Sequence, residues 1–273
     1  MCGRYVMARA TSDLVALGDA EANEDLVLRQ SWNVAPTAEV PILVAHADDV
    51  GAGVTRRIHV ARWGLVPPWA EELSVGSRAF NARSETVASK PTFRAAVRAR
   101  RCAVPVEGYY EWKTPEPGAK GPDGRAAKKQ PYYVHPAGAG DGEGPVIWFA
   151  GLYEWWQDPE AKAAGEDAWV LSTTILTMAA PDADDDDPVL AALGQLHDRL
   201  PVPMDAETMD RWLTPDTLGS AEEADALVGQ VCAGAYDVAA GWSLRPVGGA
   251  VGNVRNNGPE LIQEMREQQG TLL

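Results

Sequence analysis

The chain has 273 residues, of which 45% are hydrophobic, and this is enough to bury a substantial core within one large domain. It contains no run of 18 apolar residues, and no charged segment leads into an apolar one, so we expect neither a membrane span nor a secretory leader. The net charge of −15 argues against a general nucleic-acid-binding protein.

The charge is distributed unevenly along the chain. Residues 1–55 hold 3 basic and 8 acidic side chains, residues 56–130 hold 15 and 7, and residues 131–273 hold 6 and 24. One contiguous stretch is therefore basic within an acidic protein. This basic stretch is either a solvated surface or a groove that binds a polyanion. In the second case, the acidic surroundings would repel duplex DNA and so reduce non-specific binding.

Taken in chain order, the predicted elements are mostly strands in the first two thirds and mostly helices near the end. Short β-rich runs predict strands over residues 40–44, 57–63, 101–105, 131–134, 146–152 and 169–174. Capping residues and helical periodicity predict helices over residues 11–17, 82–89, 91–98, 205–213, 221–231 and 259–268. Strands with segregated helices, lacking a βαβ rhythm, predict one α+β domain over residues 1–273, built around a mainly antiparallel, barrel-like sheet with peripheral helices.

Four stretches have the composition of surface loops: residues 113–130, 137–145, 157–167 and 181–188. The last contains Asp184 to Asp187, four consecutive carboxylates that can bind a hard cation. A solvated acidic loop is the commoner outcome of such a run. The four histidines are scattered and no CxxC pattern occurs, so we expect no metal site and no cofactor.

Cys2 is the most informative single residue. Methionine before a small residue is normally removed, which would leave Cys2 with a thiol and an α-amine on adjacent carbons. Reference pKa values of about 8.5 and 7.7–8.0 predict that both groups are partly nucleophilic near neutral pH. Such a 1,2-aminothiol condenses with an aldehyde to an imine and closes to a thiazolidine. Position alone leaves open that Cys2 is incidental.

Several short motifs, in a fixed order, resemble one known family. They are Cys-Gly-Arg at 2–4, Trp-Asn-Val-Ala-Pro-Thr at 32–37, Arg-Trp-Gly-Leu-Val-Pro-Pro-Trp at 62–69, Phe-Asn-Ala-Arg-Ser-Glu-Thr at 80–86, Arg-Cys-Ala-Val-Pro at 101–105, Gly-Tyr-Tyr-Glu-Trp at 108–112, Leu-His-Asp-Arg-Leu-Pro at 196–201 and Val-Gly-Asn-Val-Arg-Asn-Asn at 251–257. Over nearly the whole chain they resemble the SRAP family, the SOS response-associated peptidases that process abasic sites. The resemblance implies a compact α+β domain with a basic cleft, and covalent capture of abasic sites in single-stranded DNA through a thiazolidine.

The resemblance also implies roles for four catalytic residues. Cys2 corresponds to the nucleophile and Asn81 to the residue that holds the catalytic end of the sugar, where its amide can donate to a developing oxyanion; Asn81 can equally form an Asx turn. Glu111 lies in an apolar run, which favours the protonated form of a carboxyl group and suits a proton shuttle. His197 can protonate the sugar ring oxygen as the aldehyde opens.

The DNA contacts are expected from basic and aromatic side chains. Three arginines can pair with phosphates bidentately: Arg4, Arg78 and Arg83. Trp63 and Trp69 either stack on bases beside the lesion or pack in the core, and Pro36 is expected to act as a wedge that breaks base stacking.

Two other classes of function remain open from the residues alone. One is an N-terminal-nucleophile cysteine peptidase in which the free amine acts as the base, with Met1 as a possible peptide substrate. The other is a non-catalytic module that binds single-stranded DNA. In every case we expect a reducing cytoplasm, because Cys2, Cys102 and Cys232 are odd in number and far apart. A compact single domain also favours a monomer.

Overall fold

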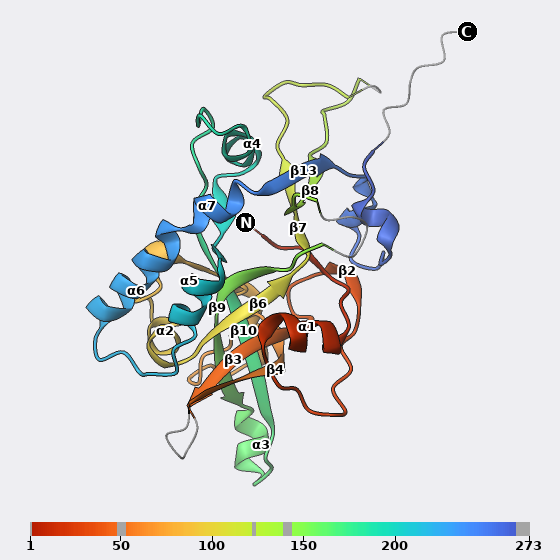
Figure 1. Cartoon of the computed structure of the whole chain (residues 1–273). Helices are drawn as coiled ribbons and strands as arrows, with labels where there is room; N and C mark the ends of the chain where they lie inside the picture. The colour runs from red at the N-terminus through yellow and green to blue at the C-terminus, as the bar shows by residue number, and fades with distance from the viewer. Residues whose placement is uncertain (1, 48–52, 122–123, 139–143, 266–273) are drawn as a thin grey trace.

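The computed structural model describes residues 2–47, 53–121, 124–138 and 144–265, and two β-sheets form its centre (Figure 1). In the larger sheet, β10 (Trp169–Ala179) pairs with β4 (Val54–Trp63) on one side and with β9 (Ile147–Gln157) on the other. Because β4, β3 (Glu39–Ala47), β6 (Arg101–Val106) and β9 are paired in turn, these strands close into a barrel.

The interior of this barrel is apolar, as the composition of its strands requires. Leu43, Val104, Phe149 and Ile175, from four different strands, are completely buried in one core cluster. Full burial of such a side chain stabilises the fold by about 1.5–3 kcal/mol. Three short strands extend the barrel sheet: β5 (Asn81–Arg83), β11 (Arg199–Pro201) and β12 (Pro203–Met204).

The second sheet is antiparallel and carries the start of the chain. Its strand order is β13 (Trp242–Pro246), β8 (Gln130–Pro136), β7 (Gly108–Lys113), β1 (Tyr5–Met7) and β2 (Ser31–Val34). Side chains alternate between its two faces. Tyr5 and Tyr109 join the main core, whereas Val6 and Tyr110 belong to a separate cluster on the other face. The strand β1 therefore brings Cys2 alongside β7.

Helices surround the sheets. They are α1 (Thr11–Gly18), α2 (Arg94–Ala99), α3 (Pro159–Ala163), α4 (Pro188–Leu196), α5 (Ala206–Trp212), α6 (Ala221–Ala233) and α7 (Ala235–Ala239), with short 3₁₀ turns η1 (Leu73–Arg78), η2 (Ser84–Thr86), η3 (Gly249–Gly252) and η4 (Pro259–Ile262). Figure 1 shows α2, α5 and α6 together on one side of the barrel, and α3 at the tip of the β9–β10 hairpin. None of the helices in the described part of the chain has the length and apolar character of a membrane span.

The predicted fold class is confirmed: the chain forms an α+β domain around a mainly antiparallel, barrel-like sheet. All six predicted strands are present, each within or close to its expected bounds. The helices predicted at 11–17, 91–98, 205–213 and 221–231 are also present, although α2 begins only at Arg94.

Three local predictions are wrong. Residues 82–89 form no α-helix, because residues 81–83 pair in parallel with β10 as strand β5 and are followed by η2. The expected loop 157–167 contains α3, whose first turn is capped by the Asp158 carboxylate. The last predicted helix, residues 259–268, is only the 3₁₀ turn η4 as far as Ile262; residues 266–268 lie outside the described part.

The acidic run is partly explained by helix capping. The Asp187 carboxylate accepts hydrogen bonds from the backbone N–H groups of Val189 and Leu190 at the start of α4, and Asp185 accepts one from the backbone of Asp187. A carboxylate at a helix N-terminus also interacts favourably with the helix dipole. Within the described ranges, no three His, Cys, Asp or Glu side chains are grouped so as to hold a metal ion.

Candidate active site

Four elements from distant parts of the sequence bring the predicted catalytic residues together. Cys2 precedes β1, Asn81 begins β5, Glu111 lies on β7, and His197 immediately follows α4. Asn81 contacts Cys2 directly, the Glu111 carboxylate is close enough to Cys2 to interact with its thiol electrostatically, and Glu111 faces His197. The site therefore lies where the second sheet meets the barrel strands β5 and β10.

Asn81 fixes the backbone of Cys2. Its side-chain N–H donates to the Cys2 carbonyl oxygen over 2.7 Å. The parallel pairing of Asn81 with Ile175 in β10 holds the asparagine in place. The Asn81 amide group thus orients the main chain of Cys2, and the alternative of a local Asx turn does not form.

The Cys2 thiol is completely buried, and its Sγ atom lies 4.0 Å from the Arg4 carbonyl oxygen. Burial, and next the negative charge of Glu111, raise the pKa of the Cys2 thiol far above its ordinary value. In the chain with Met1 in place, burial therefore disfavours the thiolate. A reaction at Cys2 needs a base that accepts the thiol proton during the step.

Glu111 is close to that thiol, and His197 is close to Glu111. The Glu111 side chain is only 7% exposed, and its Oε1 atom accepts a hydrogen bond from the backbone N–H of Trp112 over 3.1 Å. The His197 Nε2 atom lies 4.0 Å from the same oxygen. This separation is too long for a direct hydrogen bond. The distance is compatible with two groups that each exchange protons with a reactant bound between or beside them.

Two groups compete for the other ring nitrogen of His197. The backbone N–H of Arg199 points at Nδ1 over 3.0 Å, whereas the Asp198 Oδ1 atom lies 2.7 Å from the same nitrogen. The first contact needs Nδ1 without a proton, and the second needs it protonated. The Asp198 carboxylate is 84% exposed and can turn towards water, but the Arg199 amide is held by the β11 backbone. We therefore assign the neutral imidazole to the Arg199 contact.

The sequence did not predict two tyrosines close to Cys2. Tyr5 and Tyr109 are buried, and their hydroxyl pKa values are raised well above the ordinary range by burial and then by the nearby Cys2. Tyr5 Oη and Asn81 Oδ1 are buried and have no hydrogen-bond partner within the described residues. Buried polar atoms are nearly always satisfied, so these two oxygens are candidates to accept hydrogen bonds from a reactant. The only signal in the sequence was that Tyr5 lies three residues after Cys2.

The predicted phosphate-binding arginines differ in availability. Arg83 and Arg78 are exposed, whereas Arg4 is half-buried and uses one guanidinium nitrogen to donate to Asn33 Oδ1 (3.0 Å) and the Val251 carbonyl (2.9 Å). Arg4 thus has a structural role that the sequence did not predict.

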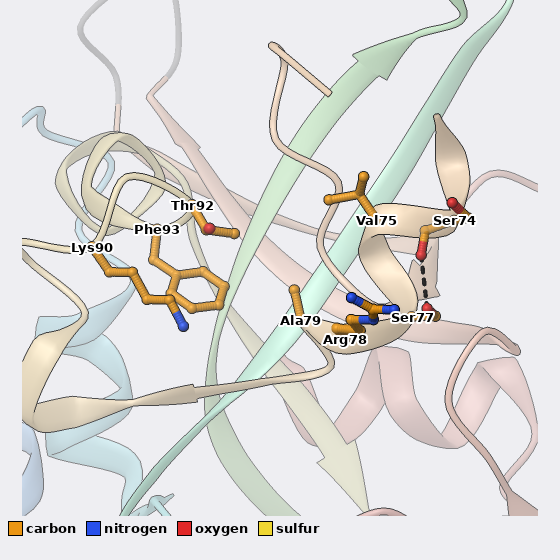
Figure 2. Close-up of a pocket in the computed structure, with 8 residues that line it drawn as sticks. All are labelled: Ser74, Val75, Ser77, Arg78, Ala79, Lys90, Thr92 and Phe93. Atoms are coloured by element: carbon orange, nitrogen blue, oxygen red, sulfur yellow. Dashed lines mark hydrogen bonds between the residues drawn. The ribbon is translucent and has the colours of Figure 1, made fainter. Parts of the chain in front are cut away.

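Arg78 lines a cleft of about 420 Å³. Figure 2 shows Ser74, Ser77 and Arg78 on one side of this cleft and Lys90, Thr92 and Phe93 on the other. Two cations and several hydroxyl groups around one depression are the kind of surface that holds a phosphate backbone. Lys90 was not predicted as part of it.

A second cleft, of about 510 Å³, lies beside Asn33 and includes Arg29 and Arg255. The Asn33 amide nitrogen donates to the carbonyl groups of Val251, Asn253 and Asn256 over 2.9–3.3 Å. These hydrogen bonds hold the motif at residues 251–257 against β2. The motif in turn places Arg255 among the residues that line this cleft.

The two tryptophans predicted as stacking platforms have different surroundings. Trp63 is completely buried, packs edge-on against Tyr5 and Phe80, and donates its indole N–H to the Phe80 carbonyl. The stacking prediction is wrong for Trp63, and the alternative of core packing is correct. Trp69 is 61% exposed, so its role as a platform stays a prediction. Pro36 is half-buried in the turn after β2, and its role as a wedge also stays a prediction.

The chain thus combines a closed barrel and a second sheet with a buried cysteine near a carboxylate, which in turn faces a histidine. The model of the family described as SOS response associated peptidase (SRAP) matches residues 1–254. The chain belongs to this family.

Characterised relatives cover most of the chain. The abasic site processing protein YoqW of Bacillus subtilis is 30% identical over 268 residues, which are 96% of this chain and 99% of the relative. YedK of Escherichia coli, with the same descriptive name, is 27% identical over 96% of this chain and 99% of its own. HMCES of Rattus norvegicus is 26% identical over 85% of this chain and 64% of its own.

Solved structures share the fold. A protein from Bacteroides thetaiotaomicron superposes with a TM-score of 0.68 and 20% identity, and the match covers 97% of this chain and 100% of that one. At this level of identity the likeness supports the fold alone.

Proposed function

We propose that this protein captures abasic sites in single-stranded DNA by forming a covalent bond through Cys2, after Met1 has been removed. The observation that carries the proposal is the placement of a fully buried cysteine next to Glu111, with His197 4.0 Å from that carboxylate. The printed names of the relatives YoqW, YedK and HMCES, which describe abasic site processing, support the same substrate.

The chemistry begins with the sugar. An abasic deoxyribose is mostly a closed hemiacetal, so its aldehyde has to be exposed before a nucleophile can attack. His197 protonates the ring oxygen as the ring opens, and we assign the unsatisfied oxygens of Asn81 and Tyr5 to hydrogen bonds with the sugar hydroxyl groups. Opening the ring yields the C1′ aldehyde without loss of any atom.

Two bonds then form to C1′. The Cys2 amine adds to the aldehyde carbon and water leaves, which gives an imine. The Cys2 sulfur then adds to the same carbon, the thiol proton passes to Glu111, and the imine nitrogen gains a proton. The product is a five-membered thiazolidine, and its mass is the sum of protein and DNA less one water. Because the thiol is held neutral, Glu111 is needed as the base in the second step.

We assign the two basic clefts to the DNA strand that carries the lesion. Arg78 and Lys90 line one, and Arg29 and Arg255 line the other. Exposed Trp69 offers a face on which an unpaired base can stack. Lysine and arginine contacts to phosphate make binding salt-dependent, and the acidic remainder of the chain disfavours unspecific binding to duplex.

A cysteine peptidase is the second candidate, and one observation bears on it. A peptidase thiol has to reach a peptide carbonyl, whereas Cys2 is fully buried with its pKa raised. This favours a small reactant, such as an aldehyde at a sugar, over a folded polypeptide. Incubation with abasic single-stranded DNA followed by denaturing electrophoresis separates the candidates. Only the proposed function gives a protein–DNA adduct that survives denaturation and disappears in Cys2→Ala.

A further inference from the structure

Arg199 lies at the junction of three segments of the candidate site. Its guanidinium donates to both carboxylate oxygens of Glu85, over 2.6 Å and 3.0 Å, and to the Thr177 carbonyl oxygen over 2.6 Å. Such a two-pronged arginine–carboxylate pair fixes orientation as well as distance. It joins η2, which follows the strand that carries Asn81, to β10 and β11.

The same arginine reaches His197 through its backbone. The Arg199 N–H is directed at His197 Nδ1 over 3.0 Å, and the pairing of Arg199 with Ala179 fixes the local backbone. A backbone N–H cannot serve as an acceptor, so the contact holds Nδ1 without a proton. A neutral imidazole then carries its proton on Nε2, which is the nitrogen that faces Glu111.

We propose that Glu85 is a positioning residue that acts through Arg199: their two-pronged pair reinforces the β11 backbone pairing that holds the Arg199 amide against His197, and so keeps the histidine in the Nε2–H form, facing the reactant. The role in catalysis rests on the proposed function, whereas the role in setting the histidine's proton position does not. Glu85 itself touches neither Cys2 nor the reacting atoms by this account.

The chemical consequence is specific to the first step. A general acid has to present its proton on the side where the sugar ring oxygen lies, and only the Nε2–H form does so. If the pair is broken, Arg199 and the peptide that follows His197 gain freedom, and the exposed Asp198 carboxylate can compete for Nδ1 and favour a proton there. Ring opening slows, but the later attack on an aldehyde that is already open does not.

The first experiment reads the histidine directly, in the DNA-free protein. Nitrogen-15 NMR distinguishes Nδ1–H from Nε2–H imidazoles, and spectra are recorded at about pH 8.5, where an ordinary imidazole is neutral. The variants are Glu85→Gln, which removes the carboxylate, and Arg199→Lys, which keeps the charge but loses the fork. Glu207→Gln removes the exposed partner of Arg211 in α5 and is the matched control.

We expect one Nε2–H signal for His197 in the wild type and in Glu207→Gln. In Glu85→Gln and Arg199→Lys we expect a mixture of the two forms. If either folded variant kept the wild-type signal of His197, the pair would not set the proton position and the proposal would be overturned. Arg199→Lys decides the matter should Glu85→Gln fail to fold.

The second experiment measures single-turnover adduct formation with two substrates. With a closed abasic sugar, Glu85→Gln is expected to react roughly tenfold more slowly, since small displacements of a catalytic group have effects of this order or larger. With a simple open-chain aldehyde its rate stays at the wild-type value. Equal slowing with both substrates would show a merely structural effect and would contradict the inference. If the wild type formed no adduct at all, the proposed function would fail while the NMR result would still stand.

Discussion

The surroundings of Cys2 and Cys102 differ in one respect that decides their chemistry. Both thiols are completely buried, and burial raises the pKa of each, that of Cys102 to about 12. Cys102 lies in β6 inside the barrel, where its sulfur is 3.5 Å from the Thr173 hydroxyl and packs against Gly151. No carboxylate contributes to its pKa.

Cys2 has a carboxylate neighbour, which Cys102 lacks among the described residues. Glu111 is close enough to raise its pKa further, and the buried oxygens of Tyr5 and Asn81 beside it have no partner among the described residues. Burial disfavours ionisation of both thiols. Under the proposed function, the neighbouring carboxylate of Glu111 is what allows Cys2 to react where Cys102 does not.

The largest expected effect comes from replacing each cysteine in turn. Cys2→Ala should abolish the denaturation-resistant adduct with abasic single-stranded DNA, because no other residue offers both an amine and a thiol. Cys102→Ala should form the adduct at the wild-type yield. The yields are compared by denaturing electrophoresis after matched incubation. Loss of the adduct in a correctly folded Cys102→Ala variant would contradict the proposed difference between the two cysteines.

Replacing carboxylates tests the role of the proton acceptor. Glu111→Gln should slow adduct formation about 10²–10⁴-fold at neutral pH, the usual range for general acid–base help, while DNA affinity stays nearly unchanged. The matched control is Glu154→Gln. Glu154 is also buried and also accepts from the next backbone N–H over 3.1 Å, but it pairs with Arg100 away from the site. Single-turnover rates across pH decide between them, and an unchanged profile for Glu111→Gln would leave the carboxylate with no chemical role.

Replacing the two tryptophans should affect different properties, stability for Trp63 and DNA binding for Trp69. Trp63→Ala removes a fully buried ring and should lower the free energy of unfolding by about 3–5 kcal/mol. Trp69→Ala should leave stability within about 0.5 kcal/mol but weaken binding to single-stranded DNA by about 1–3 kcal/mol, the usual value of one stacked base. Urea unfolding and DNA titration of both variants measure these effects. Unchanged DNA affinity in Trp69→Ala would remove it from the interface.

The raised pKa of Cys102 predicts a dependence of stability on pH. The pKa is raised from 9.0 in the unfolded reference to about 12 in the folded protein, so the folded state holds the proton more tightly. Stability from this thiol is complete below pH 9.0 and is lost as the pH rises towards 12, by up to about 1.4 kcal/mol per pH unit. Denaturant unfolding between these pH values should show a shallower decline in Cys102→Ala. An identical decline would contradict the assignment.

The smallest effect is expected from a single phosphate contact. Arg83→Ala removes an exposed cation next to the site and should weaken single-stranded DNA binding several-fold, whatever the base sequence. The slope of log affinity against log salt should fall by about 0.7, the value for one phosphate in a single strand. A loss of affinity without any change of slope would place Arg83 in a structural role instead.

Much of the site was predictable because its parts are short local motifs. Cys2, Asn81, Glu111 and His197 were each identified within a motif of a few residues, and the structure brings them together. The burial of Trp63 was not predictable, since it depends on the pairing of β4 with β10, more than 100 residues away. For the same reason the segment after Asn81 was expected to be helical, whereas pairing with Ile175 makes it a strand. The contact of Arg199 with Glu85 joins residues 114 positions apart and leaves no local pattern.

The central claim is that Cys2, freed of Met1, condenses with the aldehyde of an abasic site, and intact mass spectrometry tests it most directly. The purified protein is weighed alone and after mixing with abasic single-stranded DNA under denaturing conditions. The account predicts a protein that lacks Met1 and an adduct whose mass is that of this protein plus the DNA, less one water. A protein that retains Met1 yet forms the adduct, or an adduct of equal mass increment in Cys2→Ala, would contradict it.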